Sequence, residues 1–183
     1  MRLALVLILT VGPVFAQETS LSIGAAHYKL GSNEVRAYGP AGLAVSVQVA
    51  VWPSAPVSPT FSFHHARFAD ARPSVLEGGG FESYAGTLGL RVQPFRDGSV
   101  RPYARAALGI GREVSRAIQR AEPPRGPSFQ NRQDVLSADL ALGVTVGREL
   151  GLFGVLEVAS VSGVELFGTT THNGLRVGVG WRR

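Results

Sequence analysis

Residues 174–183 read GLRVGVGWRR, and in this stretch the side chains alternate between two kinds. Every second position is large and apolar, and the positions between are glycine or arginine. The apolar set is Leu175, Val177, Val179 and Trp181. A helix would mix the two kinds on each face, whereas successive side chains of a β-strand point to opposite faces. The stretch therefore predicts a strand with one apolar face.

The same alternation recurs clearly in four stretches upstream and, more weakly, in three others. The clear stretches are residues 43–52, 84–93, 101–111 and 136–147; the weaker ones are residues 19–30, 59–68 and 152–164. In the last of these, Glu157 interrupts an apolar run. Together they predict eight strands, an even number of the kind that closes into an antiparallel up-and-down barrel.

The predicted connections alternate in length along the chain. Long ones are expected near residues 31–41, 69–80, 114–133 and 165–172, and short ones near residues 54–58, 96–99 and 150–151. Outer-membrane barrels show this asymmetry, with tight turns at the periplasmic end and longer loops outside. Both chain ends are then expected on the side of the short turns.

Alternation alone fits a membrane barrel and a soluble lipocalin-type barrel equally, because the apolar face points outward in one and inward in the other. The composition of the second face separates them. It is mainly Gly, Ala, Ser and Thr, and charged residues make up only 17% of the chain, with a mean hydropathy of +0.14. A soluble barrel needs many charged side chains on its surface. We therefore expect the apolar rows to face lipid and the small residues to fill a narrow lumen.

Six charged residues belong to the predicted inward rows. They are Arg91, Arg101, Arg105, Asp139, Glu157 and Arg176. Arginines and carboxylates in a narrow lumen are expected to pair and plug it, which argues against an open pore. Aromatic residues near strand ends are candidates for interfacial girdles, although they are equally ordinary barrel residues. These are Tyr84, Phe95, Tyr103, Phe153 and Trp181.

The N-terminus has the form of a secretory signal peptide. Residues 1–16 contain a positive charge at Arg2, an apolar stretch from Leu3 to Val11 and an A-x-A-like cleavage site after Ala16. The apolar stretch is shorter than the roughly 20 residues that a spanning helix needs. We expect cleavage to leave residues 17–183 as one barrel domain.

Several functional classes are disfavoured by composition. The chain has no Cys, so it forms neither a disulfide scaffold nor a Cys nucleophile. His64 and His65 are adjacent and would point to opposite faces of a strand, so we predict no metal site. Basic residues are scattered, and Lys29 is the only lysine. We expect no nucleic-acid binding and no cofactor.

The stretch RPYARAALGIG (101–111), followed by a long variable loop and LALGVTVG (140–147), resembles the small outer-membrane barrel family that includes OmpA-like and OmpX-like proteins. The resemblance covers nearly all of the predicted mature chain. It implies an eight-stranded barrel in a Gram-negative-type outer membrane, inserted by the barrel-assembly machinery. Members commonly end on an aromatic residue, whereas here Arg182 and Arg183 follow Trp181.

Small barrels of this kind suggest three functional readings. The first is a monomeric, non-enzymatic barrel with a structural or surface-interaction role. In this reading the basic loop 114–133 contacts lipopolysaccharide phosphates or an acidic ligand through Arg116, Arg120, Arg125 and Arg132. The second is a lipid A-modifying enzyme, for which the last external loop offers Glu165, residues 169–171 and His172. No recognisable catalytic motif accompanies them. The third is a narrow channel. We favour the first reading.

Overall fold

The computed structural model describes residues 17–30, 41–69, 80–95, 97–118, 128–148, 150–165 and 168–183. It contains eight strands in chain order. They are β1 (Gln17–Leu30), β2 (Ala41–Val51), β3 (Val57–Ala69), β4 (Gly80–Val92), β5 (Val100–Ile118), β6 (Ser128–Gly147), β7 (Gly151–Glu165) and β8 (Gly168–Arg182). The predicted signal peptide lies outside the described residues. Among the described residues, no helix is long and apolar enough to cross a bilayer.

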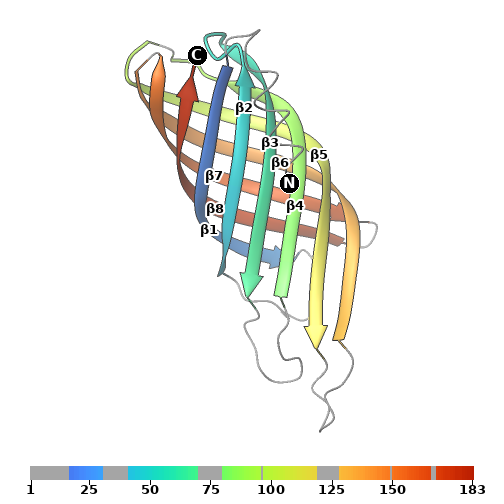
Figure 1. Ribbon diagram of the computed structural model, residues 1–183. Coiled ribbons are helices and arrows are strands. Elements are labelled where there is room, and N and C mark those ends of the chain that lie inside the picture. The colour runs from blue at the N-terminus through green and yellow to red at the C-terminus, as the bar shows by residue number, and fades with distance from the viewer. Residues whose placement is uncertain are drawn as a thin grey trace.

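The strands form a closed antiparallel barrel in which each pairs with its sequence neighbours and β8 pairs with β1 (Figure 1). A row of directly paired residues can be followed around the barrel from Tyr28 through His172, Asp139 and Ala50 to Glu18. The row returns to β1 ten residues from its start, the difference between positions 28 and 18. In an eight-stranded barrel such a shift tilts the strands by about 40° and leaves room for side chains only.

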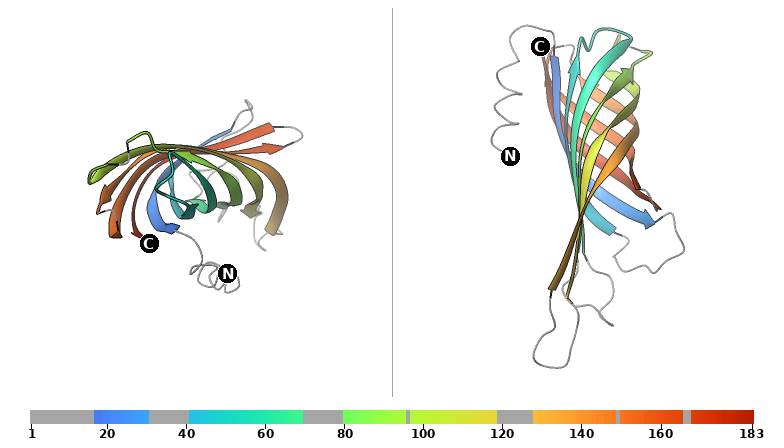
Figure 2. Two further views of the ribbon diagram at one scale, coloured as in Figure 1. Left: turned by 90° about the horizontal axis from the view of Figure 1, so that it is seen from above. Right: turned by 90° about the vertical axis from the view of Figure 1, so that its right-hand side faces the viewer.

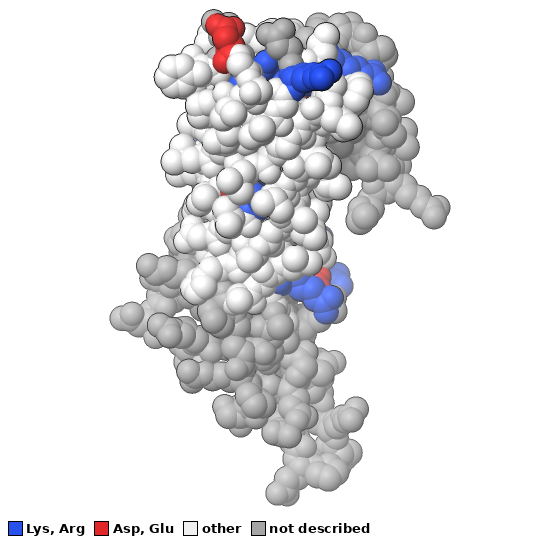
Figure 3. Space-filling model, turned by 90° about the vertical axis from the view of Figure 1, so that its left-hand side faces the viewer, with Lys and Arg blue, Asp and Glu red and all other residues white. Residues whose placement is uncertain are grey.

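Burial is inverted relative to a soluble protein. Many large apolar side chains are exposed, such as Leu108 at 72%, whereas Arg91 is 2% exposed and Asp139 is fully buried. On the face in Figure 3 the described charged residues gather at the top and again at the border of the grey residues, and the zone between these groups is almost entirely uncharged. The predicted direction of the apolar rows is confirmed, and the lipocalin-type alternative is excluded.

Glycines on the inward rows make room for aromatic rings. A Cβ at Gly143 would lie 2.5 Å from the ring of Tyr103, its partner across the strand pair, and a Cβ at Gly180 would collide with the ring of Phe153. Both rings are buried inside the barrel. Tyr103 and Phe153 therefore do not belong to an outward girdle, whereas Phe95 and Trp181 do face outward.

Two predicted external loops are shorter than expected. Strands β5 and β6 remain paired out to Ile118 and Ser128, so much of the predicted loop 114–133 is a two-stranded ribbon. Strands β7 and β8 are paired as far as Glu165 and Gly168, so the long loop predicted at residues 165–172 was wrong. The threonines there are β-branched residues that suit a strand. The right-hand view of Figure 2 shows the β5–β6 ribbon projecting beyond the other strands, at the end opposite the C-terminus.

Candidate functional site: the ion-paired lumen and the external ribbon

The centre of the lumen is organised around the guanidinium group of Arg105 on β5. It donates to Gln48 Oε1 at 2.6 Å and to Ser62 Oγ at 3.2 Å. The same group lies 3.0 Å from Asp139 Oδ2 and 3.3 Å from Glu157 Oε1. These partners come from β2, β3, β6 and β7, so one side chain links strands on opposite sides of the barrel.

His64 and Arg176 complete this central network. His64 Nε2 is 2.9 Å from Asp139 Oδ2, and Arg176 Nη1 is 3.1 Å from His64 Nδ1 and 3.3 Å from Glu157 Oε1. A guanidinium only donates, so Nδ1 accepts and Nε2 carries the proton that is donated to Asp139. The imidazole is then neutral. Two arginines and two carboxylates balance, as buried charges require.

A second group fills the periplasmic end of the lumen. Glu18 accepts hydrogen bonds from Arg91 on β4 and from Arg182 on β8. The guanidinium of Arg91 also lies over the ring of Tyr103, 5.3 Å from its centroid. The hydroxyl of Tyr103 donates to Glu157 Oε2 at 2.8 Å and so connects this group to the central network.

The external end of the lumen holds a smaller cluster. The Thr170 hydroxyl donates to Glu113, and His172 Nε2 lies 3.9 Å from the same carboxylate. The imidazole of His172 stacks on Phe68 at 5.0 Å and lies 5.6 Å from Phe81. The proton of Thr170 is directed at Glu113 and not at the imidazole, so the three side chains do not form the hydroxyl–imidazole–carboxylate order of a catalytic triad.

Charged pairs on the outer surface lie at the external edge of the apolar wall. Arg112 donates to both carboxylate oxygens of Asp134, at 2.7 and 3.2 Å, one step beyond the outward apolar residues Ile110 and Leu136. The hydrogen bond from Arg112 lowers the pKa of the Asp134 carboxyl below its usual value. Both groups are exposed, so the pair marks the boundary without adding much to stability.

The structure places the predicted site residues in two regions. All six predicted lumen residues are buried inside the barrel. Arg105, Asp139, Glu157 and Arg176 meet in the central network, Arg91 belongs to the periplasmic group, and Arg101 donates to the carbonyl oxygen of Gly98 at 3.1 Å.

The predicted basic loop is only partly described. Arg116 and Arg132 lie on the β5–β6 ribbon, where Arg132 is exposed, and Arg120 and Arg125 lie outside the described residues. Within the described ranges no group of three or more His, Asp or Glu side chains is arranged to hold a metal ion.

Several lumen residues were not anticipated from the sequence. His64, Glu18, Gln48 and Arg182 all join the networks described above. The alternation contained a signal for His64, because Phe61 and Phe63 face outward and position 64 must then face inward. Which partners an inward side chain meets depends on the register of strands distant in sequence.

No protein-family model and no curated protein sequence matches the chain. Solved structures do. Neisserial surface protein A is 14% identical over 90% of this chain and 97% of its own, with a TM-score of 0.61. The attachment invasion locus protein Ail of Yersinia pestis is 16% identical over 91% of this chain and 98% of its own, with a TM-score of 0.59. A major outer membrane protein of Thermus thermophilus is 13% identical over 91% of this chain and 99% of its own, with a TM-score of 0.55.

At these identities the likeness shows the fold. The chain has the fold of the small eight-stranded outer-membrane barrels, the fold that the resemblance to OmpA-like and OmpX-like proteins implied. The outward apolar wall and the polar lumen are the surfaces that such a barrel needs in lipid. The protein is located in the outer membrane.

Proposed function

We propose that this protein is a non-enzymatic, non-conducting surface barrel whose β5–β6 ribbon presents a basic tip to phosphate- or sulfate-bearing glycans, lipopolysaccharide foremost. The main observation in support of the proposal is the length of strands β5 and β6. Strands β5 and β6 have 19 and 20 residues, whereas the other six have 11 to 15. The extra residues of the two strands pair with each other as far as Ile118 and Ser128, so the ribbon extends beyond the other strands.

The charge of the ribbon tip suits an anionic partner. Residues 116–132 contain four arginines and a single acidic residue, Glu122. At the base of the ribbon Arg112 is neutralised by Asp134, so the excess positive charge belongs to the tip. Arginine forms paired, charge-assisted hydrogen bonds to phosphate and sulfate oxygens, which gives such a tip both attraction and geometry.

The lumen supports the non-conducting part of the proposal. Arg105, Arg176 and their carboxylate partners span the axis, and the groups at either end occupy the space above and below them. An ion entering from either end would meet paired charges and buried rings.

A barrel of the same fold gives a useful probe. Ail of Yersinia pestis, 17% identical over 91% of this chain with a TM-score of 0.60, has been solved in complex with the heparin analogue sucrose octasulfate. That complex is a property of Ail. It makes a small sulfated polyanion a suitable compound to offer to this chain.

The experiment compares the wild-type barrel in phospholipid nanodiscs with a variant in which Arg116, Arg120, Arg125 and Arg132 are all replaced by Gln. Binding is measured to lipopolysaccharide, to dephosphorylated lipopolysaccharide and to sucrose octasulfate, at low and at high ionic strength. We expect binding that needs phosphate or sulfate, weakens with salt and falls at least about ten-fold in the variant, because several charge-assisted contacts are lost.

The matched control replaces Arg148 and Arg183, which are exposed at the periplasmic end, by Gln. This variant should bind as the wild type does. Unchanged lipopolysaccharide affinity in the four-arginine variant would refute the proposed role of the tip. The proposal includes export with cleavage after Ala16, so N-terminal sequencing of the membrane form should begin at Gln17; a sequence beginning at Met1 would contradict it.

A further inference from the structure

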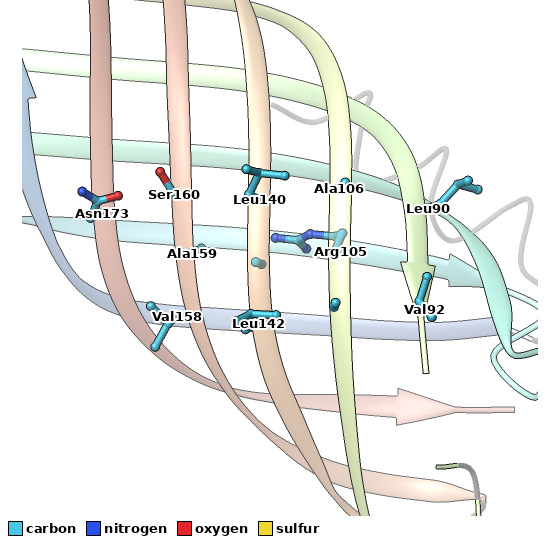
Figure 4. A pocket seen from close by; sticks show the side chains of 12 residues that line it. Leu90, Val92, Arg105, Ala106, Leu140, Leu142, Val158, Ala159, Ser160 and Asn173 are labelled. Atoms are coloured by element: carbon cyan, nitrogen blue, oxygen red, sulfur yellow. The ribbon is translucent and has the colours of Figure 1, made fainter. Parts of the chain in front are cut away.

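One row of directly paired residues on the outer wall changes from polar to apolar as it crosses the barrel. From β1 to β4 its members are His27, Asn173, Ser160, Leu140, Ala106 and Leu90. All six face away from the lumen, and Figure 4 shows five of them, from Asn173 to Leu90, in one line across the strands. We call the polar part of the row, His27, Asn173 and Ser160, the polar track.

The row descends into the membrane from its polar end. The ten-residue shift of the barrel means that a row leaving β1 toward β8 returns to β1 nearer the periplasmic end. Each step to the next strand therefore lowers the row by about 3 Å, for strands roughly 4.8 Å apart and tilted by about 40°. By this geometry Asn173 lies about 6 Å, and Ser160 about 9 Å, closer to the membrane centre than Arg112 at the external edge.

Polar side chains on this part of the wall lie deeper than on β5. The outward residues of β5 are apolar from Ala104 to Ile110, and the polar edge begins only at Arg112. Below that edge water is scarce, so polar groups are costly unless they find hydrogen-bond partners. The amide of Asn173 has two N–H donors and a carbonyl acceptor, and the hydroxyl of Ser160 both donates and accepts. A lipid that suits the track therefore needs donors as well as acceptors.

The track is continuous with the external edge of the wall. His27 is exposed, and the next outward pair toward the outside, Ser162 and Thr171, is polar as well. The hydroxyl oxygens of this pair are 3.2 Å apart, so the two side chains share a hydrogen bond. A molecule at the membrane surface thus reaches the track along β8 past polar side chains.

The apolar end of the row lies in a depression of the wall. Ala104 and Ala106 line it between longer side chains of β4 and β6, and it extends to Ser160 and Asn173 (Figure 4). Its volume is about 760 Å³, which falls in the range of roughly 300–1,000 Å³ that small-molecule sites occupy. Such sites are concave and mainly apolar, with a few polar groups. Here the polar groups lie at the external end, as an amphiphile in the outer leaflet requires.

We propose that the polar track and the depression bind one lipid whose acyl chains carry amide and hydroxyl groups just below the headgroup, as those of lipid A do. The chain amide faces Asn173, the chain hydroxyl faces Ser160, and one acyl chain continues into the depression. A glycerolipid with simple chains offers only ester carbonyls at this depth, which accept hydrogen bonds but leave the carbonyl of Asn173 without a donor. The proposal concerns the acyl region of the lipid and does not depend on what the ribbon tip binds.

The test counts the lipids that stay bound when the barrel is extracted from nanodiscs into mild detergent, by native mass spectrometry. The probes are dephosphorylated lipid A and a diglycosyl diacylglycerol, which has two sugars and chains of the same length but no chain amide or hydroxyl. Neither probe has phosphate, so the arginines of the ribbon tip do not contribute. We expect one dephosphorylated lipid A per barrel, bound about ten-fold more tightly than the diglycosyl lipid, since two polar contacts in lipid amount to roughly this factor. Equal binding of the two lipids would overturn the proposal.

A first set of variants tests the polar track. Ser160→Ala combined with Asn173→Leu should weaken the binding of dephosphorylated lipid A about ten-fold, because both polar contacts are lost, and Asn173→Gln should retain it. The variant with all four ribbon arginines replaced by Gln should bind this lipid as the wild type does. Unchanged binding in the variant that lacks both polar groups would refute the role of the track.

A second pair of variants tests the depression. Ala106→Phe fills it, whereas Gly86→Phe adds the same ring outside the depression, on β4, where a Cβ would meet nothing within 4 Å. We expect Ala106→Phe to weaken the binding of dephosphorylated lipid A at least about ten-fold and Gly86→Phe to leave it unchanged. Equal effects, or barrel dimers in place of lipid adducts, would overturn the proposal. Heat-modifiable gel mobility confirms that each variant is folded, and Ala106→Leu takes the place of Ala106→Phe if that variant does not fold.

Discussion

Replacing Glu157 by Gln should destabilise the barrel strongly although the side chain keeps its shape. Glu157 Oε1 lies 3.3 Å from a guanidinium nitrogen of Arg105 and 3.3 Å from one of Arg176. Glu157 Oε2 accepts a hydrogen bond from the hydroxyl of Tyr103 at 2.8 Å. The amide still offers one oxygen as an acceptor. What disappears is a negative charge, which leaves Asp139 as the only carboxylate facing the two buried guanidinium groups of the described central network.

The expected magnitude follows from burial. Removing one member of a buried ion pair commonly costs about 3–5 kcal/mol, because the partner is left charged and unsolvated. Here Asp139 continues to neutralise part of the charge and the amide oxygen retains a hydrogen bond. We therefore expect a loss near the lower end, about 3 kcal/mol in the free energy of unfolding.

Equilibrium denaturation in lipid vesicles measures this loss, with the fluorescence of Trp52 and Trp181 reporting the folded fraction. A second variant, Glu157→Gln with Arg176→Gln, restores equal numbers of arginines and carboxylates in the central network. The double-mutant cycle should then recover about 1–3 kcal/mol of the sum of the single losses.

The matched control is Asp134→Asn, which breaks the exposed pair with Arg112 at the external edge and should leave the unfolding free energy essentially unchanged. Two results would refute the reasoning. One is a loss for Glu157→Gln no greater than that of the control, and the other is strict additivity in the cycle, which would mean that charge balance does not organise the lumen.

Two further predictions test the packing of the lumen. Gly143→Ala should cost about 1–3 kcal/mol, because its Cβ would lie 2.5 Å from the Tyr103 ring, whereas Gly86→Ala, whose Cβ would meet nothing within 4 Å, should be close to neutral; equal losses in denaturation would contradict this account. In planar bilayers the wild-type barrel should give no stepwise current, and Arg105→Ala, which removes the side chain that links opposite walls, should give brief openings. Steady wild-type conductance would show that the lumen is not plugged.

Much of the architecture is determined by local alternation. Rows of alternating apolar residues identify the strands and their two faces, because side-chain direction in a strand depends only on position. Examples are Leu175, Val177 and Val179 on β8 and Leu140 and Leu142 on β6. The scarcity of charged residues then decides that the apolar face, and not the face of small residues, meets the lipid. Strand ends were predicted less well, since residues 169–171 read equally as a polar loop and as β-branched strand residues.

The identity of partners inside the barrel was decided only by the tertiary structure. Arg105 and Glu157 were predicted to face inward, but their meeting with His64, and that of Glu18 with Arg91 and Arg182, follows from a ten-residue shift accumulated around the closed barrel. No local pattern encodes that shift, because it is a sum over eight strand pairings.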